Sequence, residues 1–226
     1  MSTQSAMSNT GSTGSAAPRR GDDTRERLLD AIEVLIADHG FQALTHRLIA
    51  QRADVPVALL NYHYGSKEQL VEEALARRAP RLVQLQKDGL AALRNNGVWT
   101  VEDVLWAMWQ PFAVIDLRGG GEWRHYLCVV ARLASYDRGG ELFSRHFGPV
   151  ERECLYALHR TLPEVPEDDL ARGLAHCRLL FERELMERCD KCNHDPTEQR
   201  QRTERLIAFL SGGLRALEGE LARTTG

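Results

Sequence analysis

The chain has 226 residues, 43% of them hydrophobic, and a formal net charge of −3 at pH 7. This length suits one or two domains with a packed core, and the near-neutral charge gives no bulk evidence for nucleic-acid binding. No apolar run approaches the ~18 residues of a membrane span, and the N-terminus lacks the hydrophobic region of a secretory signal peptide. We therefore expect a soluble cytoplasmic protein without a membrane partner.

The first 22 residues, rich in Ser, Thr, Gly and Ala, are expected to form a disordered tail. Arg19 and Arg20 lie near its end, where they could reach a DNA minor groove or remain solvated charges. A first helix is expected from residue 23 to residue 40. Its buried stripe would consist of Leu28, Ile32, Leu35 and Ile36, with Phe41 and Leu44 filling the core beyond it.

Residues 45–67 contain two short helical patterns that meet across a tight break. Thr45 can cap the first helix, because a threonine oxygen accepts one of the free N–H groups at a helix start. Pro56 fits the first turn of the second helix, where a missing N–H costs nothing. The second helix, about residues 56–64, is too short to be stable alone and must be held by its neighbour. These features predict a helix-turn-helix arrangement.

The order Thr-x-x-x-Ile-Ala, Ala-x-Val-Pro and Leu-Asn-Tyr-His-Tyr-Gly-Ser-Lys resembles the DNA-binding domain of TetR-family transcriptional regulators. The similar region runs from about Thr24 to Leu70, and its parts are specific in this order and spacing. The sequence departs from the family at Asp54, where a turn glycine is usual. It departs again at Asn61, which is often a tyrosine. Asp tolerates a left-handed backbone better than most residues, so we expect the turn to survive.

The resemblance implies which residues contact DNA. Arg47 could contact a guanine base or a phosphate, and an internal salt bridge is the alternative. Lys67 is expected to meet a phosphate rather than to be merely solvated, while Tyr62 and His63 could reach phosphates, pack internally or be exposed. The full predicted set is Thr45, His46, Arg47, Pro56, Val57, Ala58, Asn61, Tyr62, His63 and Lys67.

Basic and acidic residues are balanced in this region. The basic ones are Arg25, Arg27, Arg47, Arg52 and Lys67, and the acidic ones are Glu26, Asp30, Glu33, Asp38, Asp54 and Glu68. Phosphate neutralisation usually supplies much of the affinity for DNA. DNA binding therefore requires the cations and the acids to lie on different faces.

The remaining chain shows helical periodicity without strand alternation or internal repeats, so the predicted fold class is all-α. Ser66 and Gln69 predict a capping box for a helix that Pro80 breaks or kinks near Ala79. Further helices are expected at residues 81–94, 100–117 with a bend near Pro111, 122–137, 141–162 with an interruption at Gly148–Pro149, 166–188, and from 195 onward. The predicted domains are the tail (1–22), the helix-turn-helix domain (23–70) and an effector-binding and dimerisation domain (71–226).

The last two predicted helices have broad apolar faces. In TetR-like proteins the corresponding helices form a four-helix bundle across a two-fold axis, and burial inside one subunit is the alternative. The residues predicted for the dimer interface are Leu170, Leu174, Phe181, Leu206, Leu210, Leu214 and Leu217.

Aromatic residues outside the helix-turn-helix region could line a cavity for a small-molecule effector, because such cavities are mostly apolar with a few polar groups. Plain core packing is the alternative. The predicted effector pocket consists of Trp106, Trp109, Phe112, Trp123, His125, Tyr126, Arg132, Arg178 and Phe181. His176 was a further candidate for a polar contact.

The five cysteines are an odd number without the spacing of a disulfide scaffold, which suits a reducing compartment. Cys189, Cys192 and His194 offer three ligands for zinc, but no second cluster follows at finger spacing. The sequence therefore predicts no metal and no other cofactor, with a metal or thiol sensor at this loop as the weaker alternative.

No catalytic constellation stands out, so we expect no enzyme activity. The sequence predicts a homodimeric repressor of transcription that binds a palindromic operator in double-stranded DNA and is released by a small-molecule effector. A helical sensor or protein-interaction module is the alternative from another class.

Overall fold

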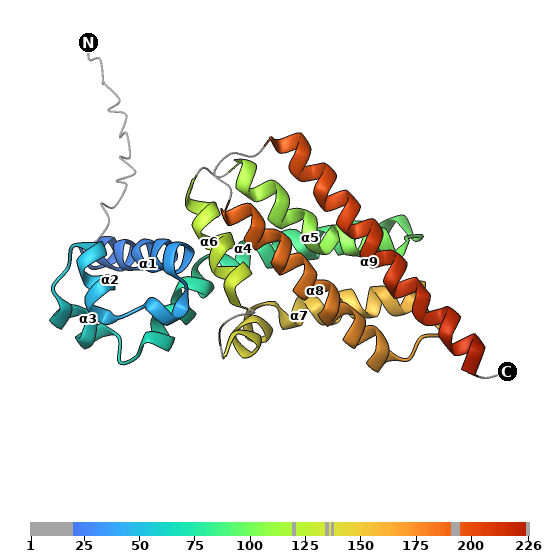
Figure 1. Cartoon of the computed structure of the whole chain (residues 1–226), viewed down its shortest axis with the longest axis horizontal. Coiled ribbons are helices and arrows are strands. Elements are labelled where there is room, and N and C mark those ends of the chain that lie inside the picture. The colour runs from blue at the N-terminus through green and yellow to red at the C-terminus, as the bar shows by residue number, and fades with distance from the viewer. Residues whose placement is uncertain (1–19, 119–120, 134–135, 137, 191–194, 225–226) are drawn as a thin grey trace, which may run out of the picture.

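The computed structural model describes residues 20–118, 121–133, 136, 138–190 and 195–224, and within these ranges every regular element is helical (Figure 1). The all-α prediction is confirmed. The elements are α1 (Arg20–His39), the 3₁₀ helix η1 (Phe41–Ala43), α2 (His46–Ala53), α3 (Val57–His63), α4 (Lys67–Asn96), α5 (Val101–Arg118), α6 (Gly121–Arg132), α7 (Gly139–Thr161), α8 (Glu167–Asp190) and α9 (Pro196–Thr224). Among the described residues, none of these helices has the length and apolarity needed to cross a membrane.

Helices α1, α2 and α3 form a small unit at one end of the molecule, which we call the head (Figure 1). The predicted stripe of α1 is buried. Phe41 of η1 and Leu44, which follows η1, fill the same core. Ile49 of α2 and Leu60 of α3 complete this core, so α3 is held by its neighbours as its shortness requires.

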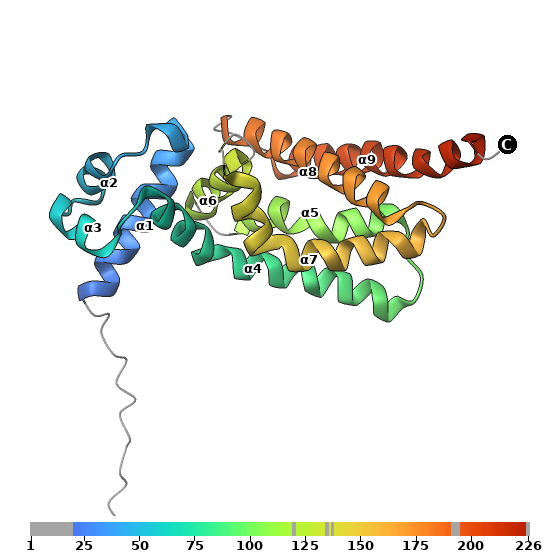
Figure 2. The same ribbon diagram turned by 90° about the horizontal axis from the view of Figure 1, so that it is seen from below.

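Helices α4 to α9 form the rest of the molecule, which we call the body (Figures 1 and 2). Helix α4 packs against α5 and α7, α5 packs against α9, and α8 packs against both α6 and α9. Helix α6 also packs against α1, so the head is joined to the body through α6 as well as through α4.

The expected break at Pro80 is wrong, because α4 runs without interruption from Lys67 to Asn96. The expected interruption at Pro149 is wrong in the same way, since α7 is continuous from Gly139 to Thr161. Both prolines lie on exposed faces. There, the carbonyl that loses its helical hydrogen bond can bond to water, so the helix tolerates the proline.

A disulfide joins Cys128 of α6 to Cys189 of α8, with their Cα atoms 5.8 Å apart. The sequence reading assigned no disulfide, and the structure corrects it. The pair closes a sequence separation of 61 residues and lies where α6 packs against α8. It therefore fixes the helix that touches the head to the end of a body helix.

Candidate DNA-binding face and body cavity

Thr45 caps the N-terminus of α2, as the sequence predicts. Its side-chain oxygen accepts a hydrogen bond from the backbone N–H of Leu48 at 3.2 Å. Thr45 and Arg47 are exposed and His46 is half-buried. Arg47 makes no hydrogen bond or ion pair with any residue that the structure describes, so its guanidinium is available to an external partner.

The turn between α2 and α3 is built around Asp54, which adopts the left-handed conformation with φ 54° and ψ 54°. The expectation that Asp can replace the usual glycine here is confirmed. Arg27 of α1 donates from Nη1 to the backbone oxygens of Ala53 and Asp54, at 3.3 and 3.4 Å. These bonds satisfy carbonyls that the end of α2 leaves free, and they fix the turn to α1.

Helix α3 begins at Val57, with Pro56 as its N-cap rather than as its first residue. Pro56, Val57 and Ala58 are exposed, and Val57 retains 40% of its surface. An apolar side chain exposed at the start of a helix suits contact with a thymine methyl group. Asn61, Tyr62 and His63 lie in the second half of α3, and their side chains are outside the described part of the structure.

Lys67 is the first residue of α4 and lies inside the capping box that Ser66 and Gln69 form. Its Nζ donates a hydrogen bond to the backbone oxygen of Phe41 at 3.2 Å, and the side chain is half-buried. The lysine thus connects the start of α4 to η1. To contact a phosphate, Nζ would have to break its hydrogen bond to the Phe41 oxygen or keep it with one N–H and use another for the phosphate.

Three acidic residues of α1 form ion pairs with arginines of α4. Arg77 lies 3.1 Å from Glu26 and 2.6 Å from Asp30, and Arg78 lies 3.4 Å from Glu33. Glu33 is only 2% exposed, and burial raises its pKa to about 7 against the opposing effect of the two arginines. Arg47 on α2 takes no part in these ion pairs. Because the paired carboxylates are partly neutralised, they repel the DNA phosphates less.

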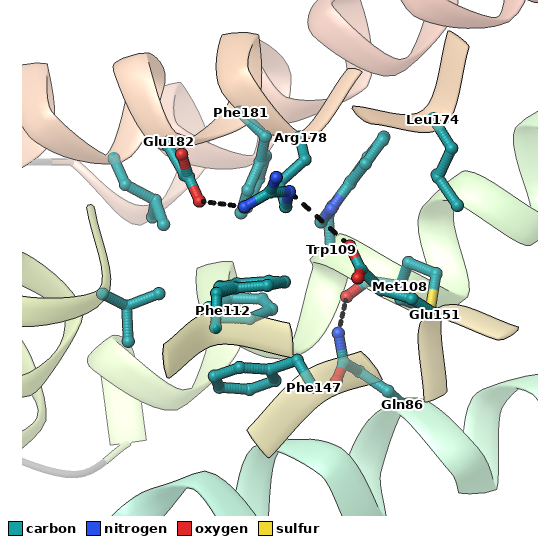
Figure 3. Close-up of a pocket in the computed structure, with 13 residues that line it drawn as sticks. Gln86, Met108, Trp109, Phe112, Phe147, Glu151, Leu174, Arg178, Phe181 and Glu182 are labelled. Atoms are coloured by element: carbon teal, nitrogen blue, oxygen red, sulfur yellow. Dashed lines mark hydrogen bonds and ion pairs between the residues drawn. The ribbon is translucent and has the colours of Figure 1, made fainter. Parts of the chain in front are cut away.

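A cavity of about 20 Å³ lies inside the body among helices α4 to α8 (Figure 3). This volume holds about one water molecule. Four of the predicted pocket residues line it, namely Trp109, Phe112, Arg178 and Phe181. The ring of Trp109 stacks on that of Phe181 at 5.3 Å between centroids, and Phe112 meets Phe181 edge-on at 5.5 Å.

The polar lining of the cavity is Gln86, Glu151, Arg178 and Glu182 (Figure 3). Arg178 lies 3.4 Å from Glu182 through Nη1 and 3.6 Å from Glu151 through Nε. Gln86 donates from Nε2 to the backbone oxygen of Met108 at 2.8 Å. Burial raises the pKa of Glu182 to about 7, although Arg178 acts in the opposite direction. Burial also raises the pKa of Glu151.

The other predicted pocket residues lie away from this cavity: Trp106, Trp123, His125, Tyr126 and Arg132. Tyr126 donates its hydroxyl to the backbone oxygen of Leu75 at 3.0 Å, and Arg132 donates to that of Ala37 at 3.0 Å. These two bonds fasten α6 to α4 and to α1. Trp106 lies under Arg200, and Trp123 lies under Arg78 and borders a separate surface pocket.

Gln86, Glu151 and Glu182 also line the cavity, and they are not among the residues predicted from the sequence. A signal for Gln86 was present, because it occupies the helical stripe of Leu82 and Leu90 and is 2% exposed like a core residue. Glu182 follows Arg178 by four residues, a spacing that brings the two side chains together on a helix. Nothing in the sequence indicates that Glu151 of α7 joins them.

Five residues predicted for the dimer interface are buried within the subunit: Leu170, Leu174, Phe181, Leu210 and Leu214. Leu206 and Leu217 are partly buried against the same core. Among the side chains of α8 and α9 that the structure describes, the large apolar ones that are exposed are Leu179, Leu180 and Phe209, and Phe209 retains 70% of its surface. These three residues are therefore large apolar groups that the described parts of the two helices can offer to a second copy.

The alternative metal site falls partly outside the described residues, where Cys192 and His194 lie. Cys189 is bonded to Cys128 and so has no thiolate to offer a metal in this state. In the described part of the chain, no group of three or more His, Cys, Asp or Glu residues is arranged to hold a metal ion.

A capped helix-turn-helix pair carried on a helical body defines a DNA-binding regulator of transcription. Residues 28–74 match the family model described as bacterial regulatory proteins, tetR family, and residues 106–213 match the model described as tetracyclin repressor-like, C-terminal domain. The chain belongs to the TetR family of transcriptional regulators.

Individual relatives are similar over different parts of the chain. The HTH-type transcriptional repressor KstR of Rhodococcus jostii is 40% identical over 60 residues, which are 26% of this chain and 28% of that protein. The match thus spans under a third of the relative's length. A putative transcriptional regulator from Pseudomonas aeruginosa PAO1 superposes with a TM-score of 0.57 at 21% identity, over 88% of this chain and 96% of that one. The structure of RolR in complex with resorcinol superposes with a TM-score of 0.51 at 14% identity, over 88% and 96%.

Proposed function

We propose that this regulator is a homodimeric repressor in the cytoplasm that binds a palindromic operator and leaves it when a small molecule enters the body cavity. The observation that carries the proposal is the continuity of α4. This helix begins at Lys67 beside the head and passes Gln86 in the cavity lining, a distance of about 28 Å at 1.5 Å per residue. A rigid helix that begins at one site and passes through the other can transmit a displacement between them.

Arg47 and Lys67 have different roles in this proposal. Arg47 is exposed and unengaged within the described chain, so it is free to read a base edge, whereas Lys67 is a phosphate contact near η1. Arg47→Ala is expected to weaken binding to a selected duplex by roughly 5- to 150-fold and to relax the preference at one position. Lys67→Ala is expected to weaken binding to all duplexes and to reduce the salt slope by about 1.

The test uses duplexes selected from a random library by the wild-type protein, followed by binding titrations over a range of salt concentrations. Arg152→Ala is the matched control, because Arg152 is an exposed arginine of α7 in the body. Unchanged binding by both head variants would remove the two assignments. The failure of the wild-type protein to select any sequence would remove the DNA-binding proposal itself.

Dimerisation is proposed through the exposed apolar face of Leu179, Leu180 and Phe209. All three are large apolar side chains exposed on the two terminal helices, which pack against each other, and an exposed apolar surface of this kind is typical of one that a second copy covers. Phe209→Asp should give a folded monomer in sedimentation equilibrium, with operator affinity much reduced. Tyr156→Asp, which changes an exposed aromatic residue of α7, should remain dimeric. A dimer that survives Phe209→Asp would place the interface elsewhere.

The disulfide supports thiol sensing as a second candidate function, since Cys128 lies in the helix that contacts α1. Reduction by a dithiol would break the S–S bond, give two thiols, and convert the dithiol to its own disulfide. Operator affinity measured with and without dithiothreitol would decide the question. An equal affinity in both states would exclude this candidate and leave ligand release unaffected.

A further inference from the structure

The cavity of the body contains two buried acceptor atoms without a hydrogen-bond partner among the described residues, Oε1 of Gln86 and Oε2 of Glu182. Both side chains are 2% exposed, so neither atom reaches bulk water. An unpaired buried acceptor carries a substantial desolvation cost. Both atoms lack a donor that a ligand could supply. Nε of Arg178 in the same lining also has no hydrogen-bond partner among the described residues, although it lies 3.6 Å from a carboxylate oxygen of Glu151.

A second pocket opens to the surface between α7 and α8, with a volume of about 270 Å³. It shares Glu151, Leu174 and Arg178 with the buried cavity. The ion pair between Arg178 and Glu151 therefore lies between the surface pocket and the cavity. Displacement of the Arg178 side chain would connect the two spaces, and their joint volume approaches that of ordinary small-molecule sites.

The charges of this site favour a cation. Two carboxylates, Glu151 and Glu182, face the single guanidinium of Arg178. An anionic ligand would add a third negative charge to the cluster, whereas a cation would pair with the carboxylate that Arg178 leaves. The aromatic walls agree with this, because the faces of Trp109 and Phe181 attract positive charge. Phe143 already holds the guanidinium of Arg178 over its ring at 4.6 Å.

We propose that the effector is an organic cation with an apolar tail, such as a primary amine on an aromatic or alkyl group. The ammonium group donates to Glu182 and Gln86, and the tail lies against the aromatic wall after Arg178 has moved toward the surface pocket. This inference rests on the proposed function, since it gives the chemical class of the molecule that would release the operator.

The experiment is calorimetric titration of the full-length protein with three probes that share one tail: phenylbutylamine, phenylbutanol and phenylbutyrate. The amine is expected to bind at least about tenfold more tightly than the alcohol, and the carboxylate more weakly than either. Glu182→Gln keeps the shape of the side chain and removes its charge. It should weaken amine binding about tenfold and change alcohol binding by less than about twofold.

Glu187→Gln is the matched control, because Glu187 lies on the same helix and pairs with Arg202 instead of facing the cavity. It should leave the affinity for the amine unchanged. Tighter binding of the carboxylate, equal amine binding by Glu182→Gln, or the absence of binding by all three probes would overturn the proposal.

Operator binding by the same protein preparations separates this inference from the proposed function. Amine binding that follows the expected order without any effect on operator affinity would support the site chemistry and contradict effector release. Operator binding that no probe alters, together with no probe binding, would overturn the ligand class and leave the DNA-binding proposal intact.

Discussion

The head and the body hold their arginines in opposite ways. Arg47 in the head is exposed and makes no ion pair with a described residue. Arg178 in the body lies between two carboxylates and over the ring of Phe143. An exposed guanidinium loses few interactions within the protein when it binds a phosphate or a base. The half-buried guanidinium of Arg178 loses its ion pairs and its ring contact when it moves, unless another group replaces them. The two arginines therefore suit different tasks, an open recognition surface for Arg47 and the proposed ligand site for Arg178.

The same contrast holds for the backbone. The predicted DNA-contact residues come from one stretch, residues 45–67, whose geometry is set by a cap, a turn and a capping box. The cavity is lined by side chains from five helices, α4 to α8. Local interactions thus define the head, while the body depends on how separate helices are held together. Three predictions test this difference.

The largest effect is expected from the disulfide between Cys128 and Cys189. A cross-link that closes 61 residues restricts the unfolded chain and contributes about 4 kcal/mol in the chain-entropy treatment. Reduction should therefore lower the denaturant midpoint that tryptophan fluorescence reports. The measurement is specific to the body, because all four tryptophans lie at or beyond Trp99.

The variant Cys128→Ala provides the control for reduction. Its midpoint should resemble that of the reduced wild-type protein and should not move further when dithiothreitol is added. A wild-type midpoint that is the same with and without the reductant would show that helix packing alone holds α6 to α8.

The disulfide also marks what the sequence could not predict. The helix-turn-helix, the Thr45 cap, the left-handed Asp54 and the capping box at Ser66 each depend on residues within a few positions of one another. The pairing of Cys128 with Cys189 depends on how α6 meets α8, and five cysteines allow many pairings.

The cavity was only partly predictable for the same reason. Composition favoured aromatic walls, and Trp109, Phe112 and Phe181 are indeed part of them. Equally aromatic Trp106 lies under Arg200 of α9, and Trp123 lies under Arg78 of α4. Which neighbour each ring meets depends on how the helices pack together, and the local sequence does not determine that. Continuity of α4 through Pro80 was missed because the exposure of that proline is a property of the folded helix pair rather than of the local sequence.

The next effect, counted for each titrating group, is a loss of stability as the pH rises, with one such group in each region. Glu33 in the head and Glu182 in the body both have a pKa raised from 4.5 to about 7. Between these values the folded chain binds more protons than the unfolded chain, so the free energy of unfolding falls as the pH increases from about 4.5 to about 7. Each group contributes on the order of 3 kcal/mol.

Denaturant titrations across this pH range can assign the two contributions. Glu33→Gln and Glu182→Gln each remove one titrating group while keeping the side-chain shape, so each variant should flatten the pH profile. The double variant should flatten it most. A profile that rises between pH 5 and 7 in the wild-type protein would mean that Arg78 and Arg178 keep the two carboxylates ionised.

The smallest effect is expected from Thr45, whose side chain accepts the hydrogen bond from the Leu48 N–H at the start of α2. Thr45→Ala leaves that N–H without its cap and should destabilise α2 by about 1 kcal/mol, whereas Thr45→Ser keeps the oxygen and should behave like the wild-type protein. Amide hydrogen exchange can measure this loss locally, and exchange of the Leu48 N–H should accelerate roughly fivefold. The tryptophan-detected midpoint of the body should stay constant if the head opens by itself. An equal loss in both regions would show that α4 and α6 join the head and the body into one cooperative unit, and the contrast between local and assembled stability would not hold.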